Sequence, residues 1–479
     1  MTGDRDLRDV SPVVITGTLS PMRATIPRMS TTPPDTPAPH PLDPLLSAHD
    51  WKRRLVLWGG AILVALAALL FARLCDGAFA LFRRALAFSP WAALAITPLV
   101  FAGLSWLTSG ALRATRGSGI PQVIASMENA DDAFAERNLS LKVSAAKLGL
   151  TALALLGGAS IGREGPTVHV GASLLYTIGR RFGYTGHQGT SRLLLAGGAA
   201  GIAAAFNAPL AGVVFAIEEL SSRFEHRFSG TLLTAVIVGG VVSLGLIGSY
   251  TYFGRVEGAL PLGAGWLAVP LCGIACGLAG GLFARLVLAL VAGRPRWFGA
   301  LRARHPVLLA ATCGLILAGL GLTFGEGMFG TGYEQARNFV QGHPQAGIEF
   351  GPLKWLANLV SYAAGIPGGL FSPALAVGAG IGHDLALLFP GQDSTVFVLL
   401  GMCAYLAGVT QAPLTSAVIC MELTDNSDMT LPILATVLLA RGASALVCRT
   451  PIYKGLAQLL LAAQPAEPPA PAAAPEKIA

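Results

Sequence analysis

The chain has 479 residues, of which 53% are hydrophobic and 12% are charged, and its formal net charge is +7. Soluble domains have about 25% charged residues, so this composition excludes an ordinary globular protein and indicates that lipid is the solvent for much of the chain. The positive charge favours basic loops at a membrane surface over nucleic acid binding, because the sequence has no basic run with interleaved aromatic residues.

The two ends of the chain differ from the rest. Residues 1–50 contain nine prolines without apolar periodicity, and residues 463–479 are rich in Pro and Ala, so both segments are predicted to be disordered extensions. The first long apolar run begins only at Leu55, and we therefore expect no cleavable signal peptide. Function is expected to reside in residues 51–462, since too few residues follow Tyr453 for a soluble regulatory domain.

Long apolar runs fill most of the chain between these ends. Most of them reach the ~20 residues that a spanning helix needs, and every backbone amide in lipid must find its partner within its own segment. The sequence therefore predicts an all-α polytopic membrane protein. The runs cover residues 55–72, 85–112, 193–217, 228–254, 258–284, 307–325 and 394–421.

Three short segments combine Gly and Pro with polar residues. They are residues 117–121 (Gly-Ser-Gly-Ile-Pro), 162–166 (Gly-Arg-Glu-Gly-Pro) and 369–373 (Gly-Leu-Phe-Ser-Pro). Glycine lets the backbone approach an ion, and proline is tolerated in the first turn of a helix. Backbone N–H groups at helix N-termini bind an anion reversibly, whereas a full positive charge would hold it too tightly to leave. Three such Gly/Pro segments in one chain predict an anion path.

Two of the Gly/Pro segments belong to an internal repeat. Gly162 and Gly369 each begin the frame G-x-x-x-P-x-x-x-V-G-A, and residues 208–218 find a matching series at residues 412–422. We therefore predict two homologous halves, at about residues 85–255 and 260–450. Repeated halves that are interrupted by Gly and Pro are typical of transporters, whose substrate site lies near the midplane of the membrane.

Glu164 lies in the second Gly/Pro segment, among long apolar runs. An isolated carboxylate within a membrane is costly and normally marks an ion path or a proton relay. At a helix N-terminus its carboxylate can occupy an anion site itself and leave that site when it is protonated. The alternative is a surface carboxylate that pairs with the adjacent Arg163.

In this order, the Gly/Pro segments resemble the three anion-binding signatures of the CLC family of chloride channels and chloride/proton antiporters. The resemblance covers about residues 51–462. It implies two inverted-topology repeats of spanning and broken half-spanning helices in a lipid bilayer, and a homodimer with one pathway for chloride and protons in each subunit. The expected lack of C-terminal regulatory domains resembles compact prokaryotic-type members, which lie in the inner (cytoplasmic) membrane.

The resemblance also implies a central chloride site. Ser118 would supply a hydroxyl, Leu370 and Phe371 would supply backbone amides, and Tyr453 would supply a phenol. Serine at position 118 resembles the chloride-selective members, because nitrate-preferring members carry proline there. Without the resemblance, Ser118 is equally well explained as a helix N-cap and Tyr453 as an interfacial aromatic residue. The other residues assigned to chloride binding are Gly117, Gly119, Arg163 and Gly165.

A proton path follows from the same resemblance. Glu164 would be the gate and the external proton glutamate, and Glu219 would be the internal proton glutamate that exchangers keep and channels replace. Glu218 is a weaker candidate for proton uptake, and together with its repeat mate Glu422 we interpret it as mainly structural. Without the resemblance, Glu219 is more simply a solvated acid at a helix end.

Lys147 matches a family lysine below the anion path, where its charge would raise the local potential for anions. Some exchangers carry acids just after the first-segment proline, and one of these can partner that lysine. Here Gln122 and Ile124 occupy those positions, so Lys147 is expected to be less well compensated, which leaves the pH dependence open. His169 has no evident partner and is expected beside the pore or in packing.

The predicted function is therefore chloride/proton antiport, and the alternative is a passive chloride channel on the same scaffold. An enzyme is not expected, because none of the eight histidines has H-E-x-x-H spacing and no Walker or G-x-S-x-G motif is present. No cofactor and no metal site are expected either. Cys272 and Cys276 share a helix face without a His or an acid, so packing is predicted for them.

Overall fold

The computed structural model describes residues 48–129, 131–184, 186–221, 229–248, 251–256, 258–260 and 263–463. The two extensions that the sequence predicts to be disordered lie outside the described residues, apart from residues 48–50 and Ala463. The contacts of the chain separate a first unit, Met1–Trp51, from a second unit, Lys52–Ala479. The second unit contains all the elements below except the first residues of α2.

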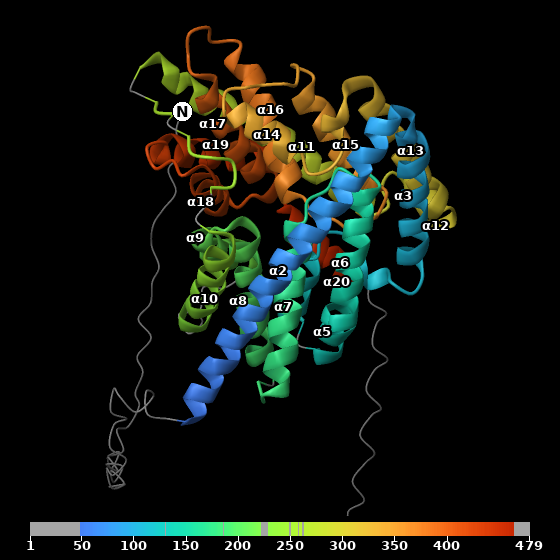
Figure 1. The fold of residues 1–479 in the computed structure, drawn as a ribbon, viewed down its shortest axis with the longest axis vertical. Helices are drawn as coiled ribbons and strands as arrows, with labels where there is room; N and C mark the ends of the chain where they lie inside the picture. The colour runs from blue at the N-terminus through green and yellow to red at the C-terminus, as the bar shows by residue number, and fades with distance from the viewer. Residues whose placement is uncertain are drawn as a thin grey trace, which may run out of the picture. The chain divides into compact units, whose positions relative to one another are not determined.

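Every regular element in the described ranges is helical (Figure 1). Within these ranges, seven helices are long and apolar enough to cross a membrane. The longer helices are α2 (Ala48–Phe88), α3 (Ala93–Ser109), α6 (Leu141–Leu156), α7 (Glu164–Arg181), α8 (His187–Phe206), α10 (Ser229–Ile247), α11 (Ala268–Val291), α13 (Pro306–Phe324), α15 (Phe350–Ala363), α16 (Phe371–Ala386), α17 (Ser394–Thr410) and α19 (Thr430–Val447). The shorter ones are α4 (Ile120–Glu128), α5 (Asp132–Leu139), α9 (Pro209–Phe215), α12 (Arg296–Arg304), α14 (Tyr333–Val340), α18 (Pro413–Thr424) and α20 (Ile452–Ala462).

Helices α7, α8 and α9 carry the first copy of the repeated sequence, and α16, α17 and α18 carry the second. In both copies the first two helices pack backbone against backbone through glycine. A Cβ atom on Gly171 of α7 would collide with the carbonyl oxygen of Gly197 of α8, and a Cβ atom on Gly378 of α16 would collide with that of Gly401 of α17. Small residues allow this close approach, which compensates for the lack of a hydrophobic driving force between helices in lipid.

Two glutamates join α9 and α18 reciprocally. Glu218 follows α9 in a π-helical turn (Ala216–Leu220), and its carboxylate accepts hydrogen bonds from two N–H groups in the first turn of α18, at 3.1 and 2.6 Å. Glu422, near the end of α18, accepts from two N–H groups in the first turn of α9, at 3.0 and 2.5 Å. Each carboxylate therefore caps a helix N-terminus in the other half, where negative charge is stabilising.

Helices α3 and α13 form an antiparallel pair. The Ser105 hydroxyl, near the end of α3, donates to the carbonyl of Pro306, the first residue of α13, at 3.0 Å. Midway along the pair, a Cβ atom on Gly314 would meet the backbone of Pro98 at 2.8 Å. At 1.5 Å per residue the two helices are about 26 and 29 Å long, close to the ~30 Å of a bilayer hydrocarbon core. The two ends of this pair therefore mark the two faces of the membrane.

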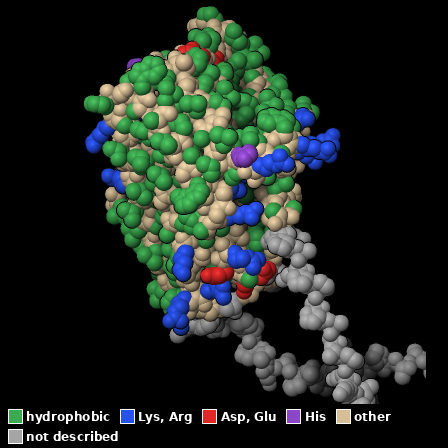
Figure 2. All heavy atoms as spheres, turned by 90° about the vertical axis from the view of Figure 1, so that its right-hand side faces the viewer, with side chains coloured by type: hydrophobic (Ala, Val, Ile, Leu, Met, Phe, Trp, Pro, Cys, Tyr) green, Lys and Arg blue, Asp and Glu red, His purple; other side chains and the backbone are tan. Residues whose placement is uncertain are grey.

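Helices α3, α12 and α13 lie on the side of the molecule that Figure 2 presents. The side chains on this face are mostly hydrophobic, with Lys and Arg gathered in separate groups. Leu99, Trp106, Leu308 and Leu315 are among the large apolar side chains that are exposed on α3 and α13. An apolar surface of this extent marks an interface with lipid or protein.

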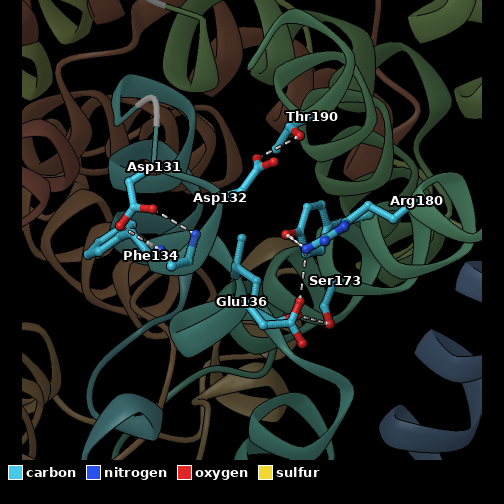
Figure 3. Close-up of polar contacts among 10 residues, drawn as sticks. Asp131, Asp132, Phe134, Glu136, Ser173, Arg180 and Thr190 are labelled. Atoms are coloured by element: carbon cyan, nitrogen blue, oxygen red, sulfur yellow. Dashed lines mark hydrogen bonds and ion pairs between the residues drawn. The ribbon is translucent and has the colours of Figure 1, made fainter. Parts of the chain in front are cut away.

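Helix α4 is short, and polar contacts around α5 hold it in place (Figure 3). Asp131 caps α5 by accepting from two N–H groups of its first turn, at 2.8 and 3.1 Å. Asp132 accepts a hydrogen bond from the Thr190 hydroxyl of α8 at 3.4 Å. Arg180, near the end of α7, forms an ion pair with Glu136 of α5 at 3.3 Å. These contacts anchor the loop that follows α4, and α4 in turn carries the first Gly/Pro segment at its start.

Candidate anion-binding site

The N-termini of α4, α7 and α16 meet where the three Gly/Pro segments lie. Gly162 and Gly369 exchange backbone hydrogen bonds, with N···O distances of 2.8 and 2.7 Å. The N–H of Gly368 donates to the carbonyl of Gly117 at 3.3 Å. The second and third segments are therefore hydrogen-bonded directly to each other, and the first is joined to Gly368, the residue before the third. The partial positive charges of three helix N-termini come together here. This is the environment that binds an anion without a formal positive charge.

Glu164 is the first residue of α7, and its side chain is 1% exposed. Its carboxylate accepts a hydrogen bond from the Ser372 hydroxyl and another from the Ser372 backbone N–H, the latter at 3.4 Å. The carboxylate therefore lies at the N-terminus of α16, where an anion would accept the same donors. Arg163 has other partners, because its guanidinium donates to Asp76 at 2.5 Å and to the Ala72 carbonyl at 3.1 Å. The alternative of a surface Glu164–Arg163 ion pair is wrong for this structure.

The third Gly/Pro segment supplies both a donor and an aromatic wall. Leu370 immediately precedes α16 and Phe371 is its first residue; both are buried. The Phe371 ring stacks on Tyr453 with 5.9 Å between ring centroids and 19° between planes, and it meets Phe215 edge-on at 5.8 Å. Sequence reasoning named the amides of Leu370 and Phe371 but did not name Ser372, the observed partner of Glu164. The available signal was that Ser372 is the one hydroxyl residue in this segment.

Ser118 and Tyr453 are both fully buried. Their hydroxyl groups lie close to each other, yet neither has a hydrogen-bond partner among the described residues. Buried hydroxyl groups are normally satisfied, so two neighbouring hydroxyl groups without a well-formed hydrogen bond indicate a site for a ligand or water. The N-cap explanation of Ser118 does not hold here, because α4 begins without a side-chain cap.

Glycine is required where the first two Gly/Pro segments touch. Gly119 has φ +104°, and a Cβ atom there would lie 2.7 Å from the Cβ of His169. A Cβ atom on Gly165 would lie 2.8 Å from the carbonyl oxygen of Ser118. The turn that presents Ser118 and the first turn of α7 are therefore in backbone contact, and no larger residue fits between them. His169 is fully buried beside this turn, and neither of its ring nitrogens has a partner among the described residues.

Lys147 supports the turn that presents Ser118. Its side chain is fully buried, and its Nζ donates to the carbonyls of Gly117 and Arg116 at 3.2 and 3.5 Å. Gln122 also donates to the Arg116 carbonyl, at 2.7 Å. Lys147 forms no ion pair with a carboxylate in the described ranges.

Lys354, which sequence reasoning missed, is the counterpart of Lys147. It precedes Phe371 by as many residues as Lys147 precedes Glu164. Its buried Nζ lies within 3.0–3.1 Å of four carbonyl oxygens, those of residues 327–330. The following residues, Gly330-Thr331-Gly332, repeat the glycine–hydroxyl–glycine order of residues 117–119. The shared G-x-G pattern is too short to be recognised alone. The equal spacing of Lys147 from Glu164 and of Lys354 from Phe371 is the signal that could have revealed Lys354.

Glu219 and Glu218 are neighbours in sequence but differ in environment. Glu219 is 3% exposed, and its Oε1 has no partner in the described part of the chain. Glu218 instead caps α18, so its carboxylate already has two hydrogen-bond donors. The arrangement fits the mainly structural interpretation of Glu218, whereas Glu219 is a buried acid with one unpartnered carboxylate oxygen.

Two cavities open at opposite ends of the α3–α13 pair. The first, here called the Arg163 cavity, is lined by Asp76, Arg83, Arg163, Tyr252, Glu326, Thr331 and Glu334 among others, and has a volume of about 660 Å³. The second, here called the Ser118 cavity, is lined by Arg113, Arg116, Ser118, Gln122, Arg302 and Tyr362 among others, and has a volume of about 480 Å³. Arg83 precedes α3 and Glu326 follows α13, whereas Arg113 follows α3 and Arg302 precedes α13. The two cavities therefore approach the site from the two faces of the membrane.

In the part of the chain that the structure describes, no group of three or more His, Cys, Asp or Glu residues is placed to hold a metal ion. All seven cysteines are buried and free. Cys272 and Cys276 lie on the buried face of α11, where they pack against the core.

Comparison with known proteins identifies relatives of this chain. The family model described as "Voltage gated chloride channel" matches residues 99–445, which is well over half of the chain. The fold is similar to that of a slow cyanobacterial Cl⁻/H⁺ antiporter, with a TM-score of 0.74 and 25% sequence identity over 86% of this chain and 98% of that one. The predicted all-helical polytopic membrane fold is confirmed.

Two further solved structures are similar. One is a eukaryotic CLC transporter, with a TM-score of 0.70 and 22% identity over 86% of this chain and 74% of that one. The other is a CLC-type fluoride/proton antiporter, with a TM-score of 0.72 and 20% identity over 86% of this chain and 99% of that one. At these identities, the two likenesses show the fold alone.

Proposed function

Because the chain belongs to the voltage-gated chloride channel (CLC) family, whose members are multi-pass membrane proteins that transport anions and are not enzymes, we propose that it exchanges chloride for protons. The observation that carries this proposal is the Glu164 carboxylate, which is buried and hydrogen-bonded to Ser372 at the N-terminus of α16. A negatively charged side chain in this place competes with an anion for the same donors. Anion movement and the charge of Glu164 are then coupled.

Glu164 acts as the gate and as the external proton acceptor in this proposal. While it is ionised, its carboxylate fills the anion position at the start of α16. Protonation removes the charge and weakens the interaction with the helix N-terminus, since the partial positive charge there favours anions. The side chain then leaves and an anion takes its place. The carboxylate adjoins Arg163, and it can exchange its proton through the Arg163 cavity.

Ser118 and Tyr453 receive the anion next. Their hydroxyl groups are buried without a hydrogen-bond partner among the described residues, and the Tyr453 ring stacks on Phe371. Two hydroxyl donors, together with the backbone N–H groups of the Gly/Pro segments, bind an anion firmly enough to dehydrate it and weakly enough to release it. Gly117, Gly119 and Gly165 keep these segments in contact with each other.

Glu219 is proposed as the internal proton site. It is buried near Tyr453 and lacks a fixed partner for one carboxylate oxygen, so it is able to take up and release a proton without breaking a structural bond. Glu218 is a weaker candidate because its carboxylate caps α18. The proton path and the anion path thus separate on the Ser118 side and meet at Glu164.

The distribution of basic residues orients the protein. Lys52 and Arg54 lie in the first two turns of α2, whose other end adjoins the start of α3. The Ser118 cavity is lined by Arg113, Arg116 and Arg302. Basic residues favour the cytoplasmic side of a membrane, so we place the Ser118 cavity on that side and the Arg163 cavity outside. We also propose the cytoplasmic membrane as the location and a homodimer as the assembly, following the CLC family.

The test is ion transport by the purified protein in liposomes, with external pH and chloride recorded together and the membrane potential clamped. A chloride gradient is expected to drive protons uphill. Glu164→Gln and Glu219→Gln are both expected to stop proton movement, and Glu219→Gln should leave chloride flux intact. Glu422→Gln, which changes a structural carboxylate, is the matched control and should retain coupled transport.

Two outcomes would change the proposal. If chloride flows while protons stay at their passive distribution, the protein is a channel and Glu219 is only an acid at a helix end. If proton transport survives in Glu219→Gln, this residue is not the internal proton site. Fluoride tested in parallel decides the substrate, because one structurally similar protein is a fluoride/proton antiporter.

A further inference from the structure

Two shallow depressions adjoin each other on the protein surface, between α5, the start of α6 and the end of α7. Their volumes are about 620 and 530 Å³, and Glu136 and Thr177 line both of them. The mechanism proposed above does not use this part of the molecule. Four basic residues complete the set that is here called the Thr177 surface: Arg137 and Lys142 in the first depression, and Arg180 and Arg181 in the second.

Two of the four basic residues on the Thr177 surface already have acidic partners. Arg180 pairs with Glu136 at 3.3 Å (Figure 3), and its guanidinium also donates to the Tyr176 hydroxyl at 2.8 Å. Arg137 pairs with Asp131 at 3.4 Å. These contacts hold α5 against the end of α7 and fix the shape of the depressions.

The other two basic residues, Lys142 and Arg181, are not neutralised in this way. Both are exposed, and neither forms an ion pair with a residue that the structure describes. Lys52 of α2 adds a third cation, because its Nζ lies 6.0 Å from the centre of the Phe182 ring, and Phe182 lines the second depression. An anion on this surface would therefore meet cations from α2, α6 and α7.

Exposed apolar side chains lie beside these cations. Phe182, which follows Arg181, is 51% exposed, and Leu141, which precedes Lys142, is 44% exposed. Both line the depressions. Paired apolar and basic side chains are typical of a membrane interface, where the apolar part faces acyl chains and the charge faces the headgroups. A phospholipid offers both parts, whereas an inorganic anion offers nothing to Phe182 and Leu141.

The position of the Thr177 surface also fits a lipid. Arg181, the last residue of α7, lies about 26 Å along the helix from Glu164, which exceeds half of the ~30 Å hydrocarbon core. Asn138 of α5 lines the Ser118 cavity, so α5 joins this cavity to the Thr177 surface on one face of the membrane. The orientation proposed above makes this face cytoplasmic, and anionic lipids give the cytoplasmic leaflet its negative surface potential.

We propose that the Thr177 surface binds the headgroup of an anionic phospholipid. Lys142, Arg181 and Lys52 attract the phosphate, and Phe182 and Leu141 contact the acyl chains. Binding needs neither Glu164 nor Ser118, so it is independent of anion transport. A lipid bound between α5 and α7 adds contacts that only the folded protein can make, and it should therefore stabilise the fold.

The experiment titrates the purified protein in a nonionic detergent with two short-chain lipids that differ in charge. Phosphatidylglycerol is anionic, and phosphatidylcholine with the same acyl chains has no net charge. We expect phosphatidylglycerol to raise the unfolding temperature and phosphatidylcholine to leave it unchanged. Inorganic phosphate at the same concentration should also have no effect, because it lacks acyl chains. Native mass spectrometry of the same samples detects the bound lipid directly.

Substitutions locate the binding position. Arg181→Gln and Lys142→Gln are each expected to weaken phosphatidylglycerol binding about fivefold at low salt, the scale of one basic residue at an anionic lipid surface. Arg181→Lys keeps the charge and should retain most of the affinity. Arg304→Gln is the matched control, because Arg304 is also an exposed arginine at the end of a helix but lines neither depression.

Equal affinities for phosphatidylglycerol in Arg181→Gln, Lys142→Gln and Arg304→Gln would overturn the inference and leave a general attraction of anionic lipid to a positive protein. Equal binding of phosphatidylcholine and phosphatidylglycerol would overturn it too, because charge would then not decide binding. Stabilisation by inorganic phosphate alone would indicate a site for a free anion instead of a lipid. None of these results bears on the proposed function, which is tested by ion flux.

Discussion

The Arg163 cavity and the Ser118 cavity are built from the same parts. Each has a wall formed by a glycine–hydroxyl–glycine turn, residues 330–332 in the first and residues 117–119 in the second, and all four glycines have positive φ. A buried lysine holds the backbone at each turn through carbonyl groups, Lys354 in the first and Lys147 in the second. The repeat has therefore placed one scaffold at both faces of the membrane.

The hydroxyl group of each turn is used differently. The Thr331 hydroxyl accepts a hydrogen bond from the Tyr333 N–H at 3.3 Å and so helps to start α14. The Ser118 hydroxyl has no partner among the described residues and faces Tyr453. The two turns have the same backbone arrangement. A hydroxyl group becomes available to bind a ligand when it no longer forms a hydrogen bond within its own turn, and the backbone does not have to change.

The charges of the two cavities differ as well. Three carboxylates and two guanidinium groups line the Arg163 cavity, and both guanidinium groups form ion pairs. Three guanidinium groups and no carboxylate line the Ser118 cavity in the described part of the chain. One end of the anion path is nearly neutral and the other is positive, so the two ends should respond differently to the same substitution.

The largest expected effect is on the two lysines that support the turns. Lys354→Met removes a donor from four carbonyl oxygens. Lys147→Met removes a donor from two, and each of these two keeps a second donor. Removing one partner of a buried charged interaction costs about 4 kcal/mol. We therefore expect Lys354→Met to lower the unfolding temperature in detergent more than Lys147→Met does. Equal losses would mean that the two turns do not depend on their lysines in proportion to these contacts.

A smaller effect is expected where the turns carry glycine. Gly119→Ala combines an unfavourable φ of +104° with a Cβ only 2.7 Å from His169, and the two together cost about 3 kcal/mol. It should lower both thermal stability and anion affinity, because Ser118 must shift. Gly149→Ala, in an open position on α6, is the control and should change neither. If Gly119→Ala binds chloride normally in calorimetry, the geometry of this turn does not set the affinity.

The hydroxyl groups test the comparison most directly. Ser118→Ala removes a donor to an anion, which is worth about 1.5 kcal/mol and predicts a roughly tenfold loss of chloride affinity. Thr331→Val removes a helix-start contact worth about 1 kcal/mol of stability and should leave affinity unchanged. Chloride titration and thermal unfolding of both variants separate these effects. Equal changes in affinity would show that Thr331 also contacts the anion.

Sequence patterns predicted the helical membrane fold and the Gly/Pro segments, and the resemblance to a family added the lysine below them. The length and composition of the apolar runs were sufficient to predict the membrane-spanning helices, because lipid requires a spanning helix to have a certain length and few polar residues. Glu164, Ser118 and Tyr453 were named because their motifs are local or resemble those of a family. The structure brings all three to the place where the helix N-termini meet.

Other features were beyond reach because they depend on contacts between distant parts of the chain. Glu218 and Glu422 were recognised as repeat mates, yet only tertiary packing shows that each caps a helix of the other half. Arg302 lies in the short basic helix α12, with no motif, and its role depends on where that helix places it beside Ser118. Ser372 was not predicted, because the sequence of a Gly/Pro segment does not show which distant carboxylate its hydroxyl group will contact.

The smallest predicted effect tests whether ion pairing alone causes the difference in charge between the two cavities. Asp76 is two-thirds exposed and pairs with Arg163 at 2.5 Å. Asp76→Asn would leave the Arg163 guanidinium without its acid and make the Arg163 cavity more like the Ser118 cavity. We expect the anion affinity measured from the Arg163 side to rise about two- to threefold at low salt, the scale of one exposed ion pair. Uptake measured with chloride presented to that side checks this, and Asp425→Asn, which removes an exposed ion pair with Arg255 away from both cavities, is the control. If this affinity stays constant or falls, the Arg163–Asp76 pair has only a structural role. The difference in anion affinity between the two sides would then arise from the arginines of the Ser118 cavity alone.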